Sequence, residues 1–99
     1  MVNVRRTNSG VEVELVGKIY AEQAAIICDR VFPFVGEGVL AYRFRMEDVS
    51  YIDSTGLGVL LSLQKRVAKQ GGEVRIAGLQ AELRKLFDLT KLTDLFVME

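Results

Sequence analysis

The sequence contains no histidine, and this absence excludes several kinds of chemistry at once. Acid–base catalysis by imidazole, a Ser-His-Asp triad and histidine-based metal binding are all ruled out. There is also only one cysteine, Cys28, which can form neither an internal disulfide nor a thiolate cluster for zinc or iron–sulfur. We therefore expect no metal site.

No charge of one sign dominates, and no long hydrophobic run is present. Thirteen Lys and Arg residues balance thirteen Asp and Glu residues, so the formal net charge is zero. We therefore expect neither direct nucleic-acid binding nor membrane binding. The apolar runs are far shorter than the ~20 residues of a membrane span, and the N-terminus lacks the apolar region of a signal peptide. Together with the scarcity of cysteine, these absences predict a cytoplasmic protein.

The apolar residues that are present predict one α/β domain spanning residues 1–99. They make up 49% of the chain, enough to fill a single core. Alternating patterns predict a hairpin of two strands at residues 2–6 and 11–17. From Ala21 the apolar spacing becomes helical, and Pro33, the only proline, should end or kink this helix near Phe32.

The rest of the chain continues this alternation of strands and helices. A strand is expected at residues 39–46, and a helix then runs from Asp53 to a left-handed glycine cap at Gly71. Residues 73–78 and 94–98 predict two more strands, separated by a third helix at 79–90. This order of strands and helices along the chain predicts a mixed four- to five-stranded sheet packed against crossover helices.

A group of polar residues interrupts the apolar stretch YIDSTGLGVLL, residues 51–61. Asp53 or Ser54 could cap the following helix, because a side-chain oxygen there satisfies a free backbone N–H and contributes about 1 kcal/mol. A phosphate on Ser54 is a second interpretation, because the dipole at a helix N-terminus favours an anion. Such a group would add negative charge to an apolar surface and could abolish docking of a partner.

Capping does not explain Gly56 and Gly58, since each glycine costs a helix roughly 1 kcal/mol relative to alanine. Missing side chains would let another backbone or a partner surface approach closely. We place Leu57, Leu60 and Leu61 on one stripe of this helix, whose first two turns are then apolar nearly all round. The sequence has neither a Walker motif nor G-x-G-x-x-G nor a G-x-S-x-G elbow, so we expect no nucleotide cofactor and no serine nucleophile.

Several spaced motifs resemble the STAS domain of bacterial anti-sigma-factor antagonists. They are DSTGLG at residues 53–58, GG at 71–72 and LFDLTKL at 86–92, in the family's order and spacing. The resemblance is strong from Val49 onward and weaker before it. It implies a regulatory protein, not an enzyme, that binds an anti-sigma factor which is also a serine kinase and thereby frees a sigma factor. Phosphorylation of the serine in this loop ends the interaction in the family, and that serine corresponds to Ser54.

The resemblance also implies a partner-binding surface around Ser54. Two positions depart from the family pattern: Tyr20 stands where an Asp is usual, and Arg45 where an Asp or Asn usually ends the strand before the loop. Arg45 could pair with a phosphate on Ser54, or it could be a solvated strand-end charge. The expected partner-binding residues are Asp53, Thr55, Gly56, Leu57, Gly58, Leu60, Tyr20 and Arg45.

Two other functions remain open from the sequence. One is a scaffold: a STAS module that binds another ATPase or a signalling assembly without modification of Ser54. The other is a small phosphoryl carrier or nucleotide-binding protein, which the absence of clustered acids and bases disfavours. The predicted hairpin edge and apolar helix start are compatible with a monomer or a weak dimer.

Overall fold

The chain alternates strands and helices in the predicted order. The structure is a computed structural model that describes all residues from 1 to 99. Its elements are β1 (Val2–Thr7), β2 (Gly10–Ile19), α1 (Ala21–Gly36), β3 (Ala41–Ile52), α2 (Ser54–Lys69), β4 (Glu73–Ala77), α3 (Ala81–Leu89), a 3-10 turn (Leu92–Asp94) and β5 (Val97–Met98).

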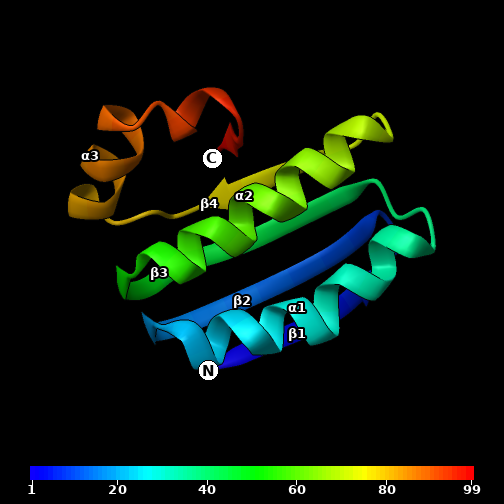
Figure 1. Ribbon diagram of the computed structural model, residues 1–99, viewed down its shortest axis with the longest axis horizontal. Helices are drawn as coiled ribbons and strands as arrows, with labels where there is room; N and C mark the ends of the chain where they lie inside the picture. Colours follow the sequence, from blue (N-terminus) through cyan, green and yellow to red (C-terminus); the bar gives the residue numbers. More distant parts are fainter.

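The strands form one mixed sheet in the order β1-β2-β3-β4-β5. The first two strands are antiparallel because only a short turn joins them, whereas the other neighbours are parallel and are joined through helices. Figure 1 shows α1 and α2 lying side by side along the sheet. The α/β fold with a mixed sheet and crossover helices is confirmed.

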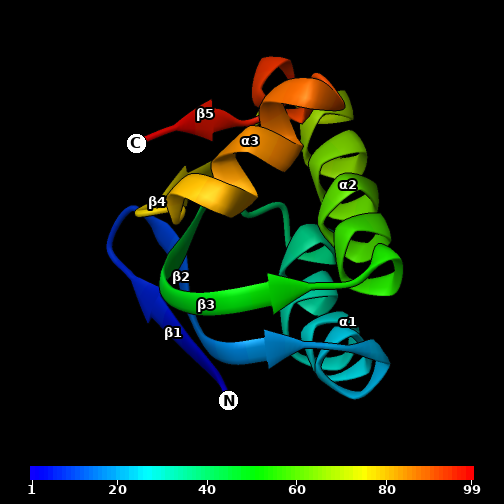
Figure 2. The same ribbon diagram turned by 90° about the vertical axis from the view of Figure 1, so that its left-hand side faces the viewer.

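The core lies between the sheet and its two long helices. Val13, Leu15 and Phe44 point to this side from the central strands and are fully buried. Ile27 of α1 and Leu63 of α2 complete the core from the side of the helices. Figure 2 shows both helices on one side of the sheet, with α3 packed at the end near β4 and β5. Only one face of the sheet is therefore covered by the long helices.

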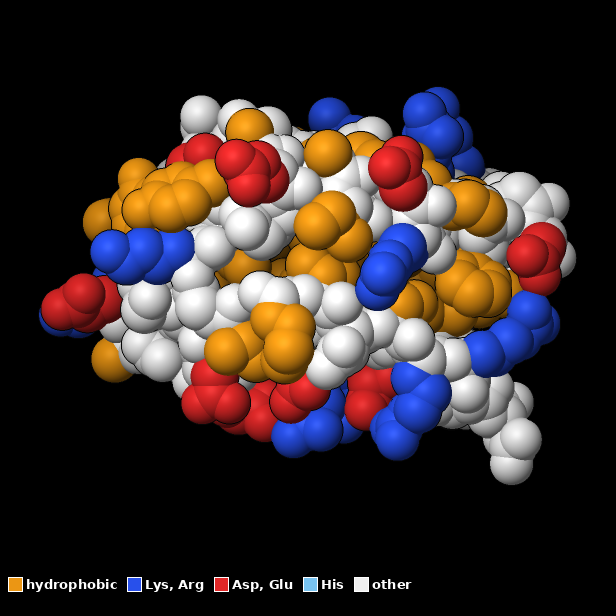
Figure 3. Space-filling model, turned by 90° about the horizontal axis from the view of Figure 1, so that it is seen from below, with side chains coloured by type: hydrophobic (Ala, Val, Ile, Leu, Met, Phe, Trp, Pro, Cys, Tyr) orange, Lys and Arg blue, Asp and Glu red, His pale blue; other side chains and the backbone are white.

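The opposite face of the sheet carries charges of both signs. Glu12 on β2 pairs with Arg5 at 2.8 Å and with Arg43 on β3 at 3.2 Å. Glu99, after β5, joins Arg43 at 2.7 Å to Arg75 on β4 at 3.2 Å. We call these five residues the open-face ion ladder. Seen from below, on the side of α1 and β1, acidic and basic side chains line one edge of the molecule (Figure 3).

Three predicted boundaries are wrong. The last strand does not begin at residue 94, because a 3-10 turn spans Leu92–Asp94 and β5 covers only Val97–Met98. Helix α1 does not end near Phe32 but continues past Pro33 to Gly36, because the proline costs only one backbone hydrogen bond near the helix end while Val35 is still buried. Strand β3 continues past residue 46 to Ile52. The apolar alternation breaks at Glu47 and Asp48, where the pairing with β2 shifts register, and this irregularity concealed the second half of the strand.

The predicted stripe of α2 is also corrected. The buried residues of this helix are Gly56, Leu60, Leu63 and Val67. Leu57 and Leu61, which were assigned to the same stripe as Leu60, are only half-buried. The predicted left-handed glycine after the helix is confirmed, since Gly71 has φ of 84°.

Candidate functional site

Two parallel strands end side by side, and a helix begins directly after each one. Ile19, at the end of β2, pairs with Ile52, at the end of β3. Tyr20 then precedes α1 and Asp53 precedes α2, so both helix N-termini lie at the same end of the sheet (Figure 1). The carboxyl ends of parallel strands are where α/β proteins commonly present binding residues.

Asp53, and not Ser54, caps α2. Its Oδ1 accepts the backbone N–H of Gly56 at 2.9 Å, and its own N–H donates to the carbonyl oxygen of Ile19 at 3.0 Å. The side chain of Ser54 is exposed, and its hydroxyl makes no hydrogen bond within the chain. The aspartate therefore caps the helix, while the serine hydroxyl stays exposed and without a hydrogen-bond partner.

The two glycines of the loop differ in their surroundings. A Cβ atom on Gly56 would lie 2.8 Å from Cγ1 of Ile52 and 3.1 Å from Cγ2 of Ile19. Gly56 is buried, so its missing side chain lets α2 lie against the ends of β2 and β3. Gly58 is exposed, and a Cβ there would meet nothing within 4 Å. Only Gly58 leaves space at the surface.

Two tyrosines form an exposed aromatic pair beside the start of α2. The ring centroids of Tyr20 and Tyr51 are 5.6 Å apart, and the residues are 44% and 46% exposed. The sequence predicted Tyr20 but not Tyr51. The signal was available in the position of Tyr51 next to core residue Ile52, since neighbouring strand residues point to opposite faces.

The structure brings together only part of the predicted surface. Ser54, Thr55 and Gly58 are exposed, and Leu57 is half-buried. The assignment of Leu60 as a partner-binding residue is wrong, because its side chain points into the core and is only 1% exposed. Gly56 is likewise buried and serves the packing just described. The apolar ring expected at the helix start is thus only a half-buried patch.

The placement of Arg45 near Ser54 is also wrong. Arg45 lies in the middle of β3, and the seven steps along the strand from it to Ile52 span about 23 Å at the usual rise. Its guanidinium pairs with Glu47 at 3.1 Å on the open face of the sheet. This hydrogen bond lowers the pKa of the Glu47 carboxyl from its usual value. Arg45 therefore cannot neutralise a phosphate on Ser54.

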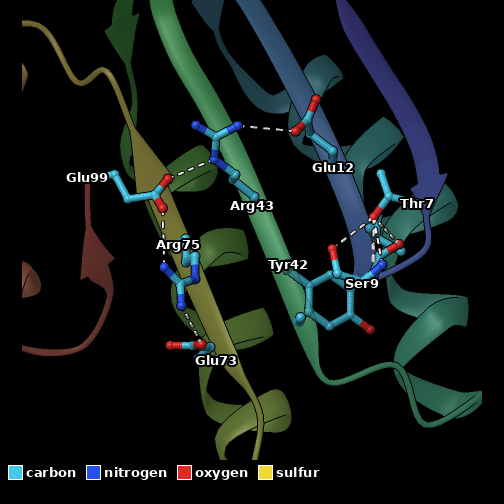
Figure 4. A pocket seen from close by; sticks show the side chains of 11 residues that line it. Thr7, Ser9, Glu12, Tyr42, Arg43, Glu73, Arg75 and Glu99 are labelled. Atoms are coloured by element: carbon cyan, nitrogen blue, oxygen red, sulfur yellow. Dashed lines mark hydrogen bonds and ion pairs between the residues drawn. The ribbon is translucent and has the colours of Figure 1, made fainter.

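A hollow of about 350 Å³ lies on the open face of the sheet, far from the helix tips. Figure 4 shows that its charged side chains already pair with one another, with Arg43 and Arg75 both held by Glu99. The hydrogen bond from Arg43, with that from Arg75, lowers the pKa of the Glu99 carboxyl. No group of three metal-ligating side chains occurs in the structure. The hollow is consequently a poor anion or metal site.

Comparison with known proteins places this geometry in a family. Residues 1–99 match the family model of the STAS domain over their whole length. The chain belongs to the STAS family. This STAS domain is 36% identical over 94 residues to an anti-sigma-B factor antagonist of Bacillus subtilis, covering 95% of the chain and 85% of the relative.

Solved structures show the same fold. The anti-sigma factor antagonist SpoIIAA in its unphosphorylated form matches with a TM-score of 0.85 and 18% identity, covering 100% of this chain and 87% of that one. The phosphorylated form of SpoIIAA from Bacillus matches with a TM-score of 0.84 and 19% identity, covering 100% and 91%. No helix of this STAS domain is long and apolar enough to cross a membrane.

Proposed function

We propose that this STAS domain is an anti-sigma-factor antagonist whose binding is switched off by phosphorylation of Ser54. It would bind an anti-sigma factor that is a serine kinase, and so release a sigma factor in the cytoplasm. The observation that carries the proposal is the free, exposed hydroxyl of Ser54 at the tip of a helix that Asp53 already caps. The 36% identical relative named as an anti-sigma-B factor antagonist supports the same assignment.

The position of Ser54 suits a phosphate physically. Asp53 accounts for the N–H groups of Gly56 and Leu57, through its side chain and its backbone carbonyl respectively. The earlier N–H groups of α2, at Ser54 and Thr55, remain free to meet an anion. The helix dipole stabilises negative charge there. A phosphate could thus be held without any refolding of the chain.

The surroundings explain how such a phosphate would prevent docking. Tyr20, Tyr51 and Leu57 place aromatic and aliphatic surface beside Ser54, and tyrosine is common at the centre of protein interfaces. A phosphoryl group adds nearly two negative charges to this surface. Burying those charges against a partner would require their desolvation, so the complex would dissociate.

Replacement of Ser54 tests the proposal. We expect Ser54→Asp to weaken binding of the cognate anti-sigma factor about tenfold or more by calorimetry, because it puts a charge into the interface. Ser54→Ala is the matched control and should bind like the wild type. Both variants should unfold at nearly the wild-type temperature. Equal binding by Ser54→Asp and wild type would argue against the switch.

A second candidate function is supported by Tyr20. A large exposed aromatic residue at the usual position of an aspartate changes the surface that a partner meets, and it could fit a different ATPase or signalling assembly. In that scaffold function Ser54 would not be modified. A Tyr20→Asp variant that binds the anti-sigma factor more tightly, while losing another partner, would favour the scaffold.

A further inference from the structure

Helix α2 carries positive charges only, although the protein as a whole is electrically neutral. Lys65, Arg66 and Lys69 lie within its last two turns, and the helix contains no acidic residue. None of these three cations forms an ion pair, and all three are exposed. The arginines that do form ion pairs are Arg5, Arg6, Arg43, Arg45, Arg75 and Arg84.

The helix dipole explains only part of this arrangement. Cations in the last turn of a helix are stabilised by the partial negative charge of its carboxyl end, and Arg66 and Lys69 occupy that turn. The dipole gives no reason for the absence of acidic partners one turn away, where Leu61 and Ser62 stand instead. Acidic residues at that spacing would stabilise the helix through ion pairs with these cations.

The surface around these cations is hollowed and partly apolar. One hollow of about 350 Å³ is lined by Gly58, Leu61, Ser62, Lys65, Arg66 and Lys69. A second, of about 400 Å³, lies between the ends of α1 and α2 and shares Arg66 and Lys69 with the first. Phe32 of α1 lines the second hollow, and the Arg66 guanidinium lies 5.0 Å from the centre of its ring. We call the two hollows and their cations the α2 groove.

The α2 groove is continuous with the surface around Ser54. Residues 54, 58, 62, 65 and 69 follow one another at intervals of three or four and therefore lie on one face of the helix. Gly58, which has open space where a side chain would stand, lies between Ser54 and the cations. A partner that contacts the start of α2 can thus extend along the same helix face.

We infer that the α2 groove is a second docking surface, which receives an acidic amphipathic segment of the same protein partner that contacts Ser54. Carboxylates of that segment would pair with Lys65, Arg66 and Lys69, while an apolar side chain would lie over Leu61 or Phe32. The inference rests on the proposed function for its partner. The proposed contact surface thus extends from the serine loop along α2, and its added part is positively charged.

A protein segment fits the groove better than a membrane or a nucleic acid does. Three cations on a protein of zero net charge give little attraction to an anionic bilayer, and stable anchoring needs a larger basic cluster or a lipid chain. The long phosphate backbone of a nucleic acid likewise calls for a basic stripe. The two adjoining hollows combine a few apolar side chains with the cations, and this mixture suits the individual side chains of a protein segment.

Charge reversal tests the inference in the full chain. The first double variant, Lys65→Glu/Lys69→Glu, reverses two charges and retains Arg66 with its contact to Phe32. The second, Lys65→Gln/Lys69→Gln, removes the same charges without adding negative ones, and so controls for a folding defect caused by added negative charge. Lys85→Glu/Lys91→Glu is the matched control, because both of its lysines are exposed, unpaired and outside the groove. Binding to the purified cognate anti-sigma factor is measured by calorimetry at low and high salt, beside Ser54→Asp.

We expect the groove reversal to weaken binding about tenfold or more, with a smaller loss for the glutamine pair and a reduced salt dependence for both. The control should stay within about twofold of wild type. Equal effects of groove and control variants would overturn the inference. If the groove variants bind like wild type while Ser54→Asp binds more weakly, the inference about the α2 groove is overturned and the proposed function stands.

Two further outcomes also count against the α2 groove as a protein surface. If the wild type does not bind the anti-sigma factor, the proposed function fails and the inference fails with it. If the wild type binds phosphatidylserine vesicles and the groove reversal abolishes that binding, a lipid surface is the occupant instead.

Discussion

Asp53 and Ser54, neighbours at the start of α2, have different roles. The carboxylate of Asp53 accepts a hydrogen bond from the backbone N–H of Gly56, whereas the hydroxyl of Ser54 has no partner. The sequence indicated that either residue could cap the helix but did not distinguish between them. The choice depends on where the helix begins, and the boundary of a helix is set by its packing as well as by its first residues.

Substitution at these two positions should separate their tasks. We expect Asp53→Ala to lower the free energy of unfolding by about 1 kcal/mol, because a cap is lost, whereas Ser54→Ala should change it very little. Chemical denaturation followed by circular dichroism measures both. A larger loss for Ser54→Ala than for Asp53→Ala would show that the serine is chiefly structural.

The two glycines offer an equally sharp contrast. Gly56→Ala should lower the free energy of unfolding by about 1–3 kcal/mol, because its methyl group would press on Ile52 and Ile19. Gly58→Ala, at an open helical position, should instead raise it by up to about 1 kcal/mol. Thermal unfolding of both variants provides the comparison. If both changes stabilise the chain, α2 is not held against the strand ends as the structure shows.

At the scale of elements, regular patterns were predictable and irregular ones were not. The alternation in β2 and the helical spacing of α1 were visible because one face of each element is buried. The bulged second half of β3 was not, since charged Glu47 and Asp48 interrupt its pattern. That error moved Arg45 from mid-strand to the serine loop and produced a false phosphate partner. Leu60 was misplaced because apolar residues surround α2 at that point, so the sequence alone did not show which ones face the core.

The open-face ion ladder ties four strands together. With the neighbouring Arg45–Glu47 pair, it should make the free energy of unfolding depend on pH. Pairing with Arg43 lowers the pKa of Glu99, and pairing with Arg45 lowers that of Glu47, each from a usual value of 4.5. A lowered pKa means that the stabilisation is complete above the usual value and is lost as the pH falls through the lowered one. Stability should therefore decline on acidification below the usual carboxyl range.

Glu99→Gln is the variant that checks this dependence. It removes the charge that joins Arg43 to Arg75, so it should be less stable than wild type at neutral pH. The difference should shrink as the pH falls, because the wild-type carboxylate becomes protonated too. Denaturation midpoints across the acid range give the comparison. A difference that does not vary with pH would mean that the ladder adds no charge-dependent stability.

At the scale of the whole molecule, charge is balanced in number but not in position. The open face of the sheet pairs its charges internally, whereas α2 leaves three cations free. The exposed tyrosine pair, the free serine and this cationic helix all lie on the helical side or at the helix tips. A partner that uses the serine loop would therefore meet an aromatic surface at one end of α2 and a positive one at the other.

Phosphorylation itself tests the central claim most directly. The chain is incubated with ATP and the proposed partner, an anti-sigma factor that is a serine kinase. The modified residue is located by mass spectrometry, and the affinity of the modified chain is measured by calorimetry. We predict a single phosphoryl group on Ser54, its absence in Ser54→Ala, and a large loss of affinity after modification. No phosphoryl group on Ser54, or undiminished binding by the chain that carries one, would contradict the claim.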